Sequence, residues 1–216
     1  MTIIAPSVLS LDYSRFESQL SDLHVSKAQW LHFDVMDGHF VPNLTFGPDI
    51  LKAFRKASHL FLDVHLMVED PEFFSDVFMD AGADMITFHT EALHHDSTRI
   101  LALIKKIKDR GVKVGLSVKP KTSLETLIPY IQEVDMFLIM SVEPGFGGQS
   151  FIPQSLEKIS VLRTLIDQSQ SSALIEVDGG INSYTGNLCK QAGANVLVAG
   201  SYIFKEDIIG AVESLW

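Results

Sequence analysis

The sequence contains a single cysteine, Cys189, among its 216 residues. One thiol cannot form an internal disulfide framework or a zinc site built from several cysteines. Positive charge is also scarce, because 17 lysines and arginines face 27 acidic residues and the formal net charge is −10. Such a balance disfavours nucleic acid and anionic membrane surfaces as partners. We therefore expect no nucleic acid and no membrane among the partners.

Long apolar runs are missing as well. No stretch approaches the roughly 20 apolar residues that a helix needs to cross a bilayer. The first residues, MTIIAPSVLSLD, have no basic segment ahead of their short apolar run, whereas a secretory signal peptide would have one. We expect a cytoplasmic protein.

Short apolar runs with strand character recur along the chain, and helix-like stretches separate them. One such stretch has Asp70 as its N-cap and Pro71 at its first helical position, and Gly82 ends it. Two further helices are expected at about 98–110 and after Pro153. The expected strands lie at about 3–8, 30–36, 60–67, 84–88, 112–118, 136–141, 173–178 and 195–200.

The spacing from strand to strand is near the roughly 30 residues of a βαβ unit. Eight such units without a break in composition predict an α/β fold, a single (β/α)8 TIM barrel in which residues 1–216 form one catalytic domain. An open, doubly wound sheet is the competing architecture. Its G-x-G-x-x-G fingerprint is absent after the first strand, where the run is SVLSLDYS.

Ionisable residues interrupt the second expected strand, in LHFDVMDGHFVPN (31–43). His32 and Asp34 are two residues apart and therefore share one face, opposite the apolar residues between and beside them. The apolar face belongs against the helices, so the pair is expected to point into the barrel near its C-terminal mouth, where active sites of such barrels lie. Asp37 is expected to be structural and to turn the chain away.

Similar groups end two other expected strands. Asp63 and His65 share a face in DVHLM, and Asp178 ends the seventh strand in IEVDGGIN. Two histidines with one or two carboxylates suit a first-row divalent metal, and imidazole favours zinc, iron, cobalt or manganese over magnesium or calcium. Asp63 lies one step deeper and is expected either to orient His65 or to cap structure. His89, in TFHTE, is either near the site or structural.

Glycines cluster after the last three expected strands, in VEPGFGGQSF, DGGIN and AGSYIF. Glycine lets backbone N–H groups approach an anion closely, and the barrel phosphate site is typically built from the loops after strands seven and eight. The three stretches contain no lysine or arginine. We therefore expect a phosphate held by neutral amides.

At this point the chain resembles the ribulose-phosphate 3-epimerase family over nearly its whole length. The two glycine blocks and the long block that begins at His32 are specific to that family. The resemblance is carried by APSVLSLD (5–12), HFDVMDGHFVPNLTFGP (32–48), DVHLMVEDP (63–71), VEPGFGGQSFIP (142–153), VDGGIN (177–182) and AGANVLVAGS (192–201).

The resemblance implies a TIM barrel of the ribulose-phosphate-binding type. It would be an isomerase that interconverts D-ribulose 5-phosphate and D-xylulose 5-phosphate in the pentose phosphate pathway. It also implies one divalent metal ion per subunit, with zinc favoured over iron, cobalt or manganese, held by His32, Asp34, His65 and Asp178. Asp34 and Asp178 would be the two acid/base groups. Family members range from dimers upward, so a homo-oligomer is expected.

The resemblance also assigns residues around a small phosphorylated ketose. Met36, Met67 and Met140 would shield the intermediate, although plain core filling explains them equally well. Tyr202 departs from the family, because a small residue is common there. The expected substrate contacts are Ser7, His65, Gly145, Phe146, Gly147, Gly148, Gly179, Gly180, Gly200 and Ser201.

The chemistry is consistent with this placement. Inverting C3 of a 2-ketose requires one group to remove a proton and a second group to return one to the opposite face. Asp34 on the second strand and Asp178 on the seventh are well separated around an eight-stranded barrel and can flank that carbon. A metal ion can stabilise the enediolate as a Lewis acid.

Three alternatives stay open. The first is an epimerase of the same chemistry that acts on D-allulose 6-phosphate. The second is a phosphosugar lyase, although the D-x-K-x-x-D run of related decarboxylases has no lysine here. A Schiff-base aldolase would need a lysine in the mouth, and Lys119 is the one candidate. The third is a non-catalytic barrel that binds a phosphosugar.

Overall fold

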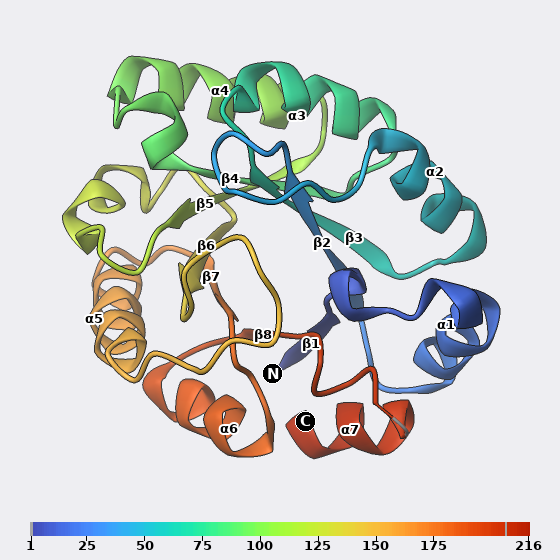
Figure 1. The fold of residues 1–216 in the computed structure, drawn as a ribbon. Helices are drawn as coiled ribbons and strands as arrows, with labels where there is room; N and C mark the ends of the chain where they lie inside the picture. Colours follow the sequence, from blue (N-terminus) through green and yellow to red (C-terminus); the bar gives the residue numbers. More distant parts are fainter. Residues whose placement is uncertain (1, 206) are drawn as a thin grey trace.

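The computed structural model describes residues 2–205 and 207–216. Eight parallel strands alternate with helices along the described chain, and the helices form a ring around the strands (Figure 1). The predicted (β/α)8 TIM barrel is confirmed. The strands are β1 Ile3–Pro6, β2 Trp30–Met36, β3 Phe61–Met67, β4 Met85–His89, β5 Lys113–Val118, β6 Met136–Met140, β7 Leu174–Asp178 and β8 Val196–Ala199.

The helices lie in the chain segments that follow each strand. The α-helices are α1 Phe16–Val25, α2 Pro48–Ala57, α3 Pro71–Asp80, α4 Ser97–Asp109, α5 Ser155–Gln168, α6 Ser183–Ala192 and α7 Ile208–Leu215. Short 3-10 helices are η1 Val8–Ser10, η2 Tyr13–Arg15, η3 Thr90–Leu93, η4 Leu124–Thr126 and η5 Ile128–Tyr130.

Local sequence signals account for where the helices begin. The Asp70 side chain accepts a hydrogen bond from the Phe73 N–H at 2.9 Å, and Pro71 is the first helical residue of α3, as predicted. At α6, Asn182 and Thr185 form a reciprocal capping box. These caps supply partners for the N–H groups that a helix leaves free at its start.

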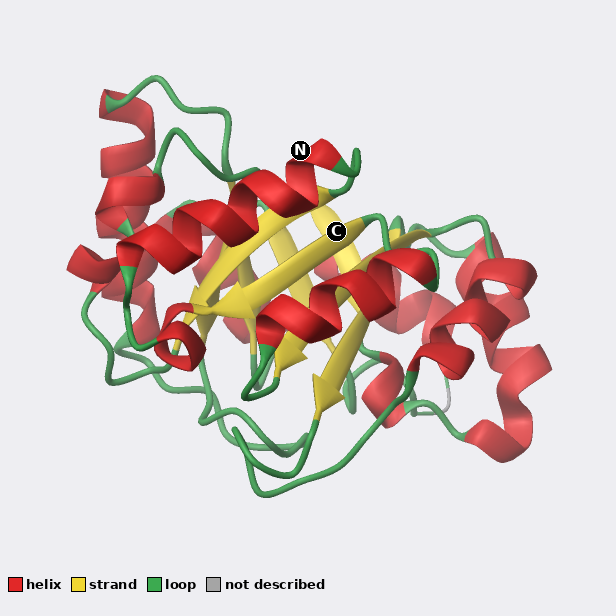
Figure 2. Ribbon diagram, turned by 90° about the horizontal axis from the view of Figure 1, so that it is seen from above, coloured by secondary structure: helices red, strands yellow, loops and turns green. Residues whose placement is uncertain are grey.

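The barrel interior is layered along its axis. The first residue of seven strands is apolar, and these residues form a packed cluster that closes the N-terminal end of the lumen. They are Ile3, Trp30, Phe61, Met85, Met136, Leu174 and Val196. The polar residues His32, Asp34, His65 and Asp178 lie further along β2, β3 and β7. The long loops extend from the end of the barrel to which the strand arrows point (Figure 2).

One seam of the barrel differs from the others. The sheet order is β1-β8-β7-β6-β5-β4-β3-β2, and β1 meets β2 through an isolated bridge between Ser7 and His32. Near the other end of the seam, the Gln29 side chain takes the place of a backbone partner, since its Oε1 accepts the Ile4 N–H at 2.9 Å. The Gln29 N–H in turn donates to the Ile4 carbonyl at 3.2 Å. Side chains thus help to close this seam.

Candidate active site

Four side chains from three strands converge on the axis of the barrel. Each of His32, Asp34, His65 and Asp178 offers one ligand atom, and these four atoms lie within 4.8 Å of one another. The β2–β3 register places Asp34 opposite His65, while Asp178 ends β7. The His32 Nε2 and the His65 Nδ1 each lie 3.3 Å from the Asp34 Oδ1. The structure therefore brings together the residues that the strand period places on the lumen face.

The donor set fits a divalent cation. It comprises two imidazole nitrogens and two carboxylates, a combination that suits zinc and other first-row metals. The side chains of His32 and His65 are fully buried, and Asp34 is 4% exposed. Buried charges of one sign need a counter-charge, so the cluster is one that could bind a metal.

The buried Asp63 carboxylate binds the ring nitrogen of His32 that faces away from Asp34. The His32 Nδ1 donates to the Asp63 Oδ2 at 2.6 Å, because the strand register pairs His32 with Asp63. The expectation that Asp63 orients His65 is therefore wrong, and it orients His32 instead. With Nδ1 bonded to Asp63, Nε2 is the His32 nitrogen that faces Asp34 and would bind a cation.

Glu176 is a buried residue that the sequence reasoning missed. Its Oε1 lies 3.7 Å from the His32 Nδ1, and it is fully buried on β7. Burial and the neighbouring Asp63 raise the pKa of Glu176 well above its ordinary value, although His32 opposes them. The signal that could have found it is the same two-residue period, since Glu176 lies two residues before Asp178 in LIEVD.

The two candidate acid/base groups have opposite pKa shifts. Burial raises the pKa of Asp34, but the neighbouring His32 and His65 outweigh burial, and the net shift is downward. Burial raises the pKa of Asp178 to about 7, with repulsion from Asp34 adding to the effect and His32 opposing it. Pairs of carboxyl groups whose environments separate their pKa values are typical of acid/base pairs.

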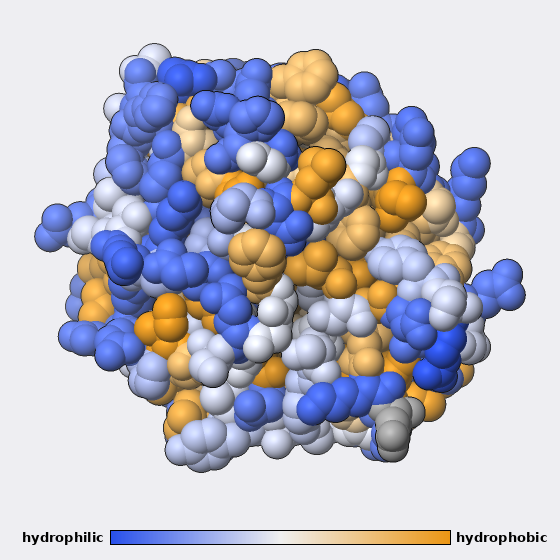
Figure 3. Space-filling model, in the orientation of Figure 1, coloured by the Kyte–Doolittle hydropathy of each residue, from blue (hydrophilic) through white to orange (hydrophobic). Residues whose placement is uncertain are grey.

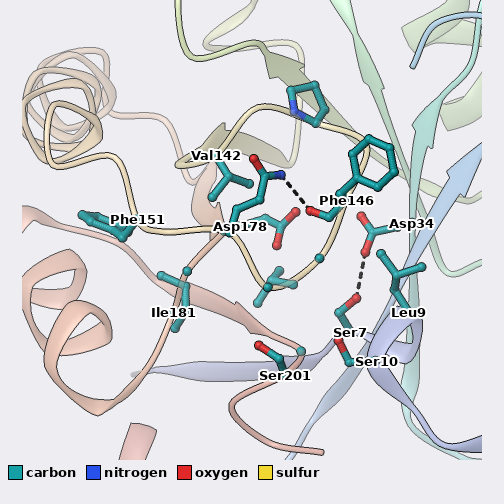
Figure 4. Close-up of a pocket in the computed structure, with 18 of the residues that line it drawn as sticks. Ser7, Leu9, Ser10, Asp34, Val142, Phe146, Phe151, Asp178, Ile181 and Ser201 are labelled. Atoms are coloured by element: carbon teal, nitrogen blue, oxygen red, sulfur yellow. Dashed lines mark hydrogen bonds between the residues drawn. The ribbon is translucent and has the colours of Figure 1, made fainter. Parts of the chain in front are cut away.

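Ser7 joins the cluster from β1. Its hydroxyl donates to the Asp34 Oδ2 at 2.7 Å, and the residue is 5% exposed (Figure 4). The two Asp34 oxygens therefore have different partners, with Ser7 on one and the two histidines on the other. This arrangement fixes the plane of the carboxylate.

A cavity of about 370 Å³ opens above the cluster. Asp34 and Asp178 point into it (Figure 4), and the mouth has hydrophilic residues at its rim and paler or apolar ones in its middle (Figure 3). The predicted substrate residues other than His65 all line it, and so do the three methionines. They are Ser7, Gly145, Phe146, Gly147, Gly148, Gly179, Gly180, Gly200, Ser201, Met36, Met67 and Met140.

Two glycines beside the cavity have no space for a Cβ. Gly180 has a φ of +63°, and a Cβ there would lie 2.5 Å from the backbone nitrogen of Phe151. At Gly200 a Cβ would lie 2.5 Å from the Ser10 Oγ. Glycine thus allows two loops to approach each other closely.

The loop after β8 adds a positively charged side chain to the lining of this cavity. Lys205, just beyond the stretch AGSYIF, lines the cavity together with Tyr202. That neutral amides hold a phosphate stays a prediction. The glycine motifs did not indicate Lys205, because the loop after β8 continues past Phe204 before α7 begins. Lys119, the lysine suspected from sequence, lies 4.0 Å over the Phe40 ring and is not among the residues lining the cavity.

The methionines cover part of the cavity wall. Met36 and Met67 pack with Val41 in a small buried cluster that Phe40 joins. Met140 packs with Leu138 and Val142 in another. Both clusters place a flexible apolar surface beside the carboxylates.

A known family of proteins matches almost the whole chain. The profile of the ribulose-phosphate 3 epimerase family matches residues 3–204. The chain belongs to this family. It is an epimerase, an enzyme of the isomerase class, which excludes the non-catalytic alternative.

Individual relatives agree over almost the whole chain. The ribulose-phosphate 3-epimerase of Chlamydia muridarum is 42% identical over 99% of this chain and 92% of its own length. That of Bacillus subtilis is 43% identical over 94% of this chain and 93% of its own. That of Treponema pallidum is 46% identical over 93% and 90%, respectively.

Solved structures with low sequence identity share the fold. The 3-hexulose-6-phosphate synthase from Salmonella typhimurium has a TM-score of 0.71 at 21% identity, and covers 99% of this chain and 96% of its own. The 3-keto-L-gulonate-6-phosphate decarboxylase from Vibrio cholerae has a TM-score of 0.74 at 13% identity, and covers 99% of this chain and 95% of its own.

Among the described residues, none of the helices has the length and apolar character to cross a membrane.

Proposed function

We propose that residues 1–216 form one catalytic domain that inverts C3 of D-ribulose 5-phosphate to give D-xylulose 5-phosphate, a step of the pentose phosphate pathway. The observation that carries this proposal is the pair Asp34 and Asp178, which point into one cavity with pKa values shifted in opposite directions. Asp34 is ready to accept a proton, and Asp178, with a pKa of about 7, can both hold and release one near neutral pH. The family of the chain and the names of its relatives support the choice of reaction.

In the proposed reaction Asp34 removes the proton from C3, and the electrons of that C–H bond move into an enediolate. Asp178 then donates its proton to the opposite face of C3, and the electron pair forms the new C–H bond. The reverse reaction exchanges the two roles. Ser7 and the histidines orient Asp34, while Met36 and the other methionines exclude water from the enediolate.

We propose one divalent ion per subunit, held by His32, Asp34, His65 and Asp178. Zinc is our first choice, with iron, cobalt or manganese as alternatives. The ion would act as a Lewis acid toward the negative charge that develops on the substrate oxygens. The fit of two nitrogens and two carboxylates within 4.8 Å supports this assignment.

The phosphate of the ketose would occupy the glycine-rich end of the cavity. Backbone N–H groups of the loops after β6, β7 and β8 would bind it, together with Ser201. Lys205 adds a positive charge at the edge of this end.

Two substitutions test the acid/base pair. Asp34→Asn and Asp178→Asn each remove a proton-transfer group and should lower kcat by about 100-fold or more, with the fold retained. Asp109→Asn, an exposed surface carboxylate that pairs with Lys105, is the matched control and should keep full activity. Near wild-type turnover of either site variant would refute the two-aspartate scheme.

One isotope experiment tests reaction, substrate and metal together. Deuterium incorporation at C3 should be measured for D-ribulose 5-phosphate and for D-allulose 6-phosphate, with and without a chelator. We expect faster exchange with the pentulose and loss of exchange after chelation, restored by a divalent ion. Preference for the hexulose would favour the allulose-6-phosphate alternative.

A lyase is a second candidate because one lysine does line the cavity. If Lys205 formed a Schiff base, borohydride would trap the substrate on it. We expect no trapping, since the proposed chemistry needs no amine.

The cytoplasmic location and the homo-oligomeric state stay predictions. Light scattering of the purified protein checks the second.

A further inference from the structure

A line of buried polar side chains leads from His65 away from the cavity. The His65 Nε2 lies 2.8 Å from the His89 Nε2, and the His89 Nδ1 lies 3.5 Å from the Glu91 Oε2. Both histidines are fully buried. The proposed acid/base chemistry does not use His89 or Glu91.

The short distance between the two Nε2 atoms requires one of them to donate and the other to accept. The opposite nitrogen of His65, Nδ1, faces Asp34 at 3.3 Å and belongs to the candidate cation cluster. A nitrogen that binds a cation must keep its lone pair free. A neutral imidazole carries one hydrogen, on one of its two ring nitrogens. That hydrogen then belongs on Nε2, from which it is donated to His89.

The tautomer of His89 is constrained by Glu91 in the same way. His89 accepts at Nε2, so the hydrogen of its neutral ring belongs on Nδ1, which lies 3.5 Å from the Glu91 Oε2. Among the described residues, the His89 Nδ1 and the Glu91 Oε2 have no hydrogen-bond partner other than this mutual contact. The Glu91 carboxylate can only accept, so its contact with the His89 Nδ1 favours a hydrogen on that nitrogen and sets the direction of the His65–His89 hydrogen bond.

Glu91 is held in place and ionised by the loop after β5. Its Oε1 accepts the Lys119 N–H at 2.7 Å and the Thr122 hydroxyl. Burial raises the pKa of Glu91, but the hydrogen bonds with His89, Thr122 and Lys119 outweigh burial and lower it to about 2. The Oε2 atom is left to accept from His89.

We propose that His89 and Glu91 are positioning residues that hold His65 in its Nε2–H tautomer, so that its Nδ1 lone pair faces the cation cluster. This inference rests on the proposed function, because the cation belongs to it. Residues behind a metal-binding histidine commonly fix its tautomer in this way, and their loss typically weakens metal binding 10- to 100-fold.

The substitution Glu91→Gln tests the proposal sharply. The amide oxygen can still accept from Lys119 and Thr122, so the loop keeps its anchor. The amide NH₂ then faces the His89 Nδ1 and requires it to accept, which moves the hydrogen of His89 to Nε2 and that of His65 to Nδ1. We expect zinc to bind about 10- to 100-fold more weakly to this variant in a chelator competition.

The matched control is Glu125→Gln, which removes an exposed carboxylate from the neighbouring η4. It should bind zinc like the wild type. If Glu91→Gln does so too, the proposal is wrong. If the wild type itself binds no divalent ion, the metal part of the proposed function fails instead.

A measurement on the unmodified protein avoids any dependence on folding of the variant. Long-range ¹H–¹⁵N correlation spectra distinguish the two tautomers of each histidine. We expect Nε2–H for His65 and Nδ1–H for His89 when zinc is bound. A hydrogen on the His65 Nδ1 would overturn the proposal.

Discussion

Gly180, which lines the cavity, has no room for a side chain. Gly180→Ala adds a methyl group to a left-handed residue and forces it against the backbone of Phe151. We expect a loss of about 2–4 kcal/mol in the free energy of unfolding, from backbone strain and overpacking together. Urea unfolding measures it.

Gly38→Ala is the control that separates the two causes. Gly38 also has a positive φ, +77°, but a Cβ there would meet no atom within 4 Å. It should cost only the backbone strain, about 1–2 kcal/mol. Equal losses in the two variants would show that the contact with Phe151 does not matter.

The strand period was enough to predict which residues face the lumen, but not which of them touch. His32 and Asp34 alternate with apolar residues along one strand, so one sequence segment reveals their common face. The partner of Asp63 depends on the register between β2 and β3, which no single segment contains. Asp63 was therefore assigned to the wrong histidine.

Helices depend on signals within a few residues, and the three helices expected from the sequence correspond to α3, α4 and α5. The cap of α3 gives a direct test. Asp70→Ala removes the acceptor for the Phe73 N–H and should lower the free energy of unfolding by about 1 kcal/mol. Asp70→Asn keeps a capping oxygen and should stay close to the wild type in the same urea titration. Equal loss in both variants would mean that charge and not capping is responsible.

The ends of elements were predicted less well than their existence. The helix expected at about 98–110 is Ser97–Asp109, because Asp96 caps it and accepts from the Thr98 and Arg99 N–H groups. The loop after β8 is longer than the apolar motif AGSYIF suggests. Lys205 was missed for that reason, since the glycine pattern ends before it.

The whole molecule depends on closure of the seam between β1 and β2. Gln29→Leu leaves the buried Ile4 N–H without its acceptor and should cost roughly 1–3 kcal/mol. Gln29→Glu retains an acceptor and should cost less. Thermal unfolding compares the two, and faster amide exchange at Ile4 in the leucine variant locates the effect. Unchanged exchange there would show that the seam does not need this side chain.

The bridge between Ser7 and His32 closes the barrel at the other end of the same seam, and the Ser7 hydroxyl also orients Asp34. A refolding chain therefore cannot align this carboxylate before its first strand has docked beside the second. Helical signal would return early during refolding, whereas turnover would return only with the final docking step. Partly folded chains should show no turnover at all, not only a reduced turnover rate. Activity is therefore a stringent reporter of complete folding.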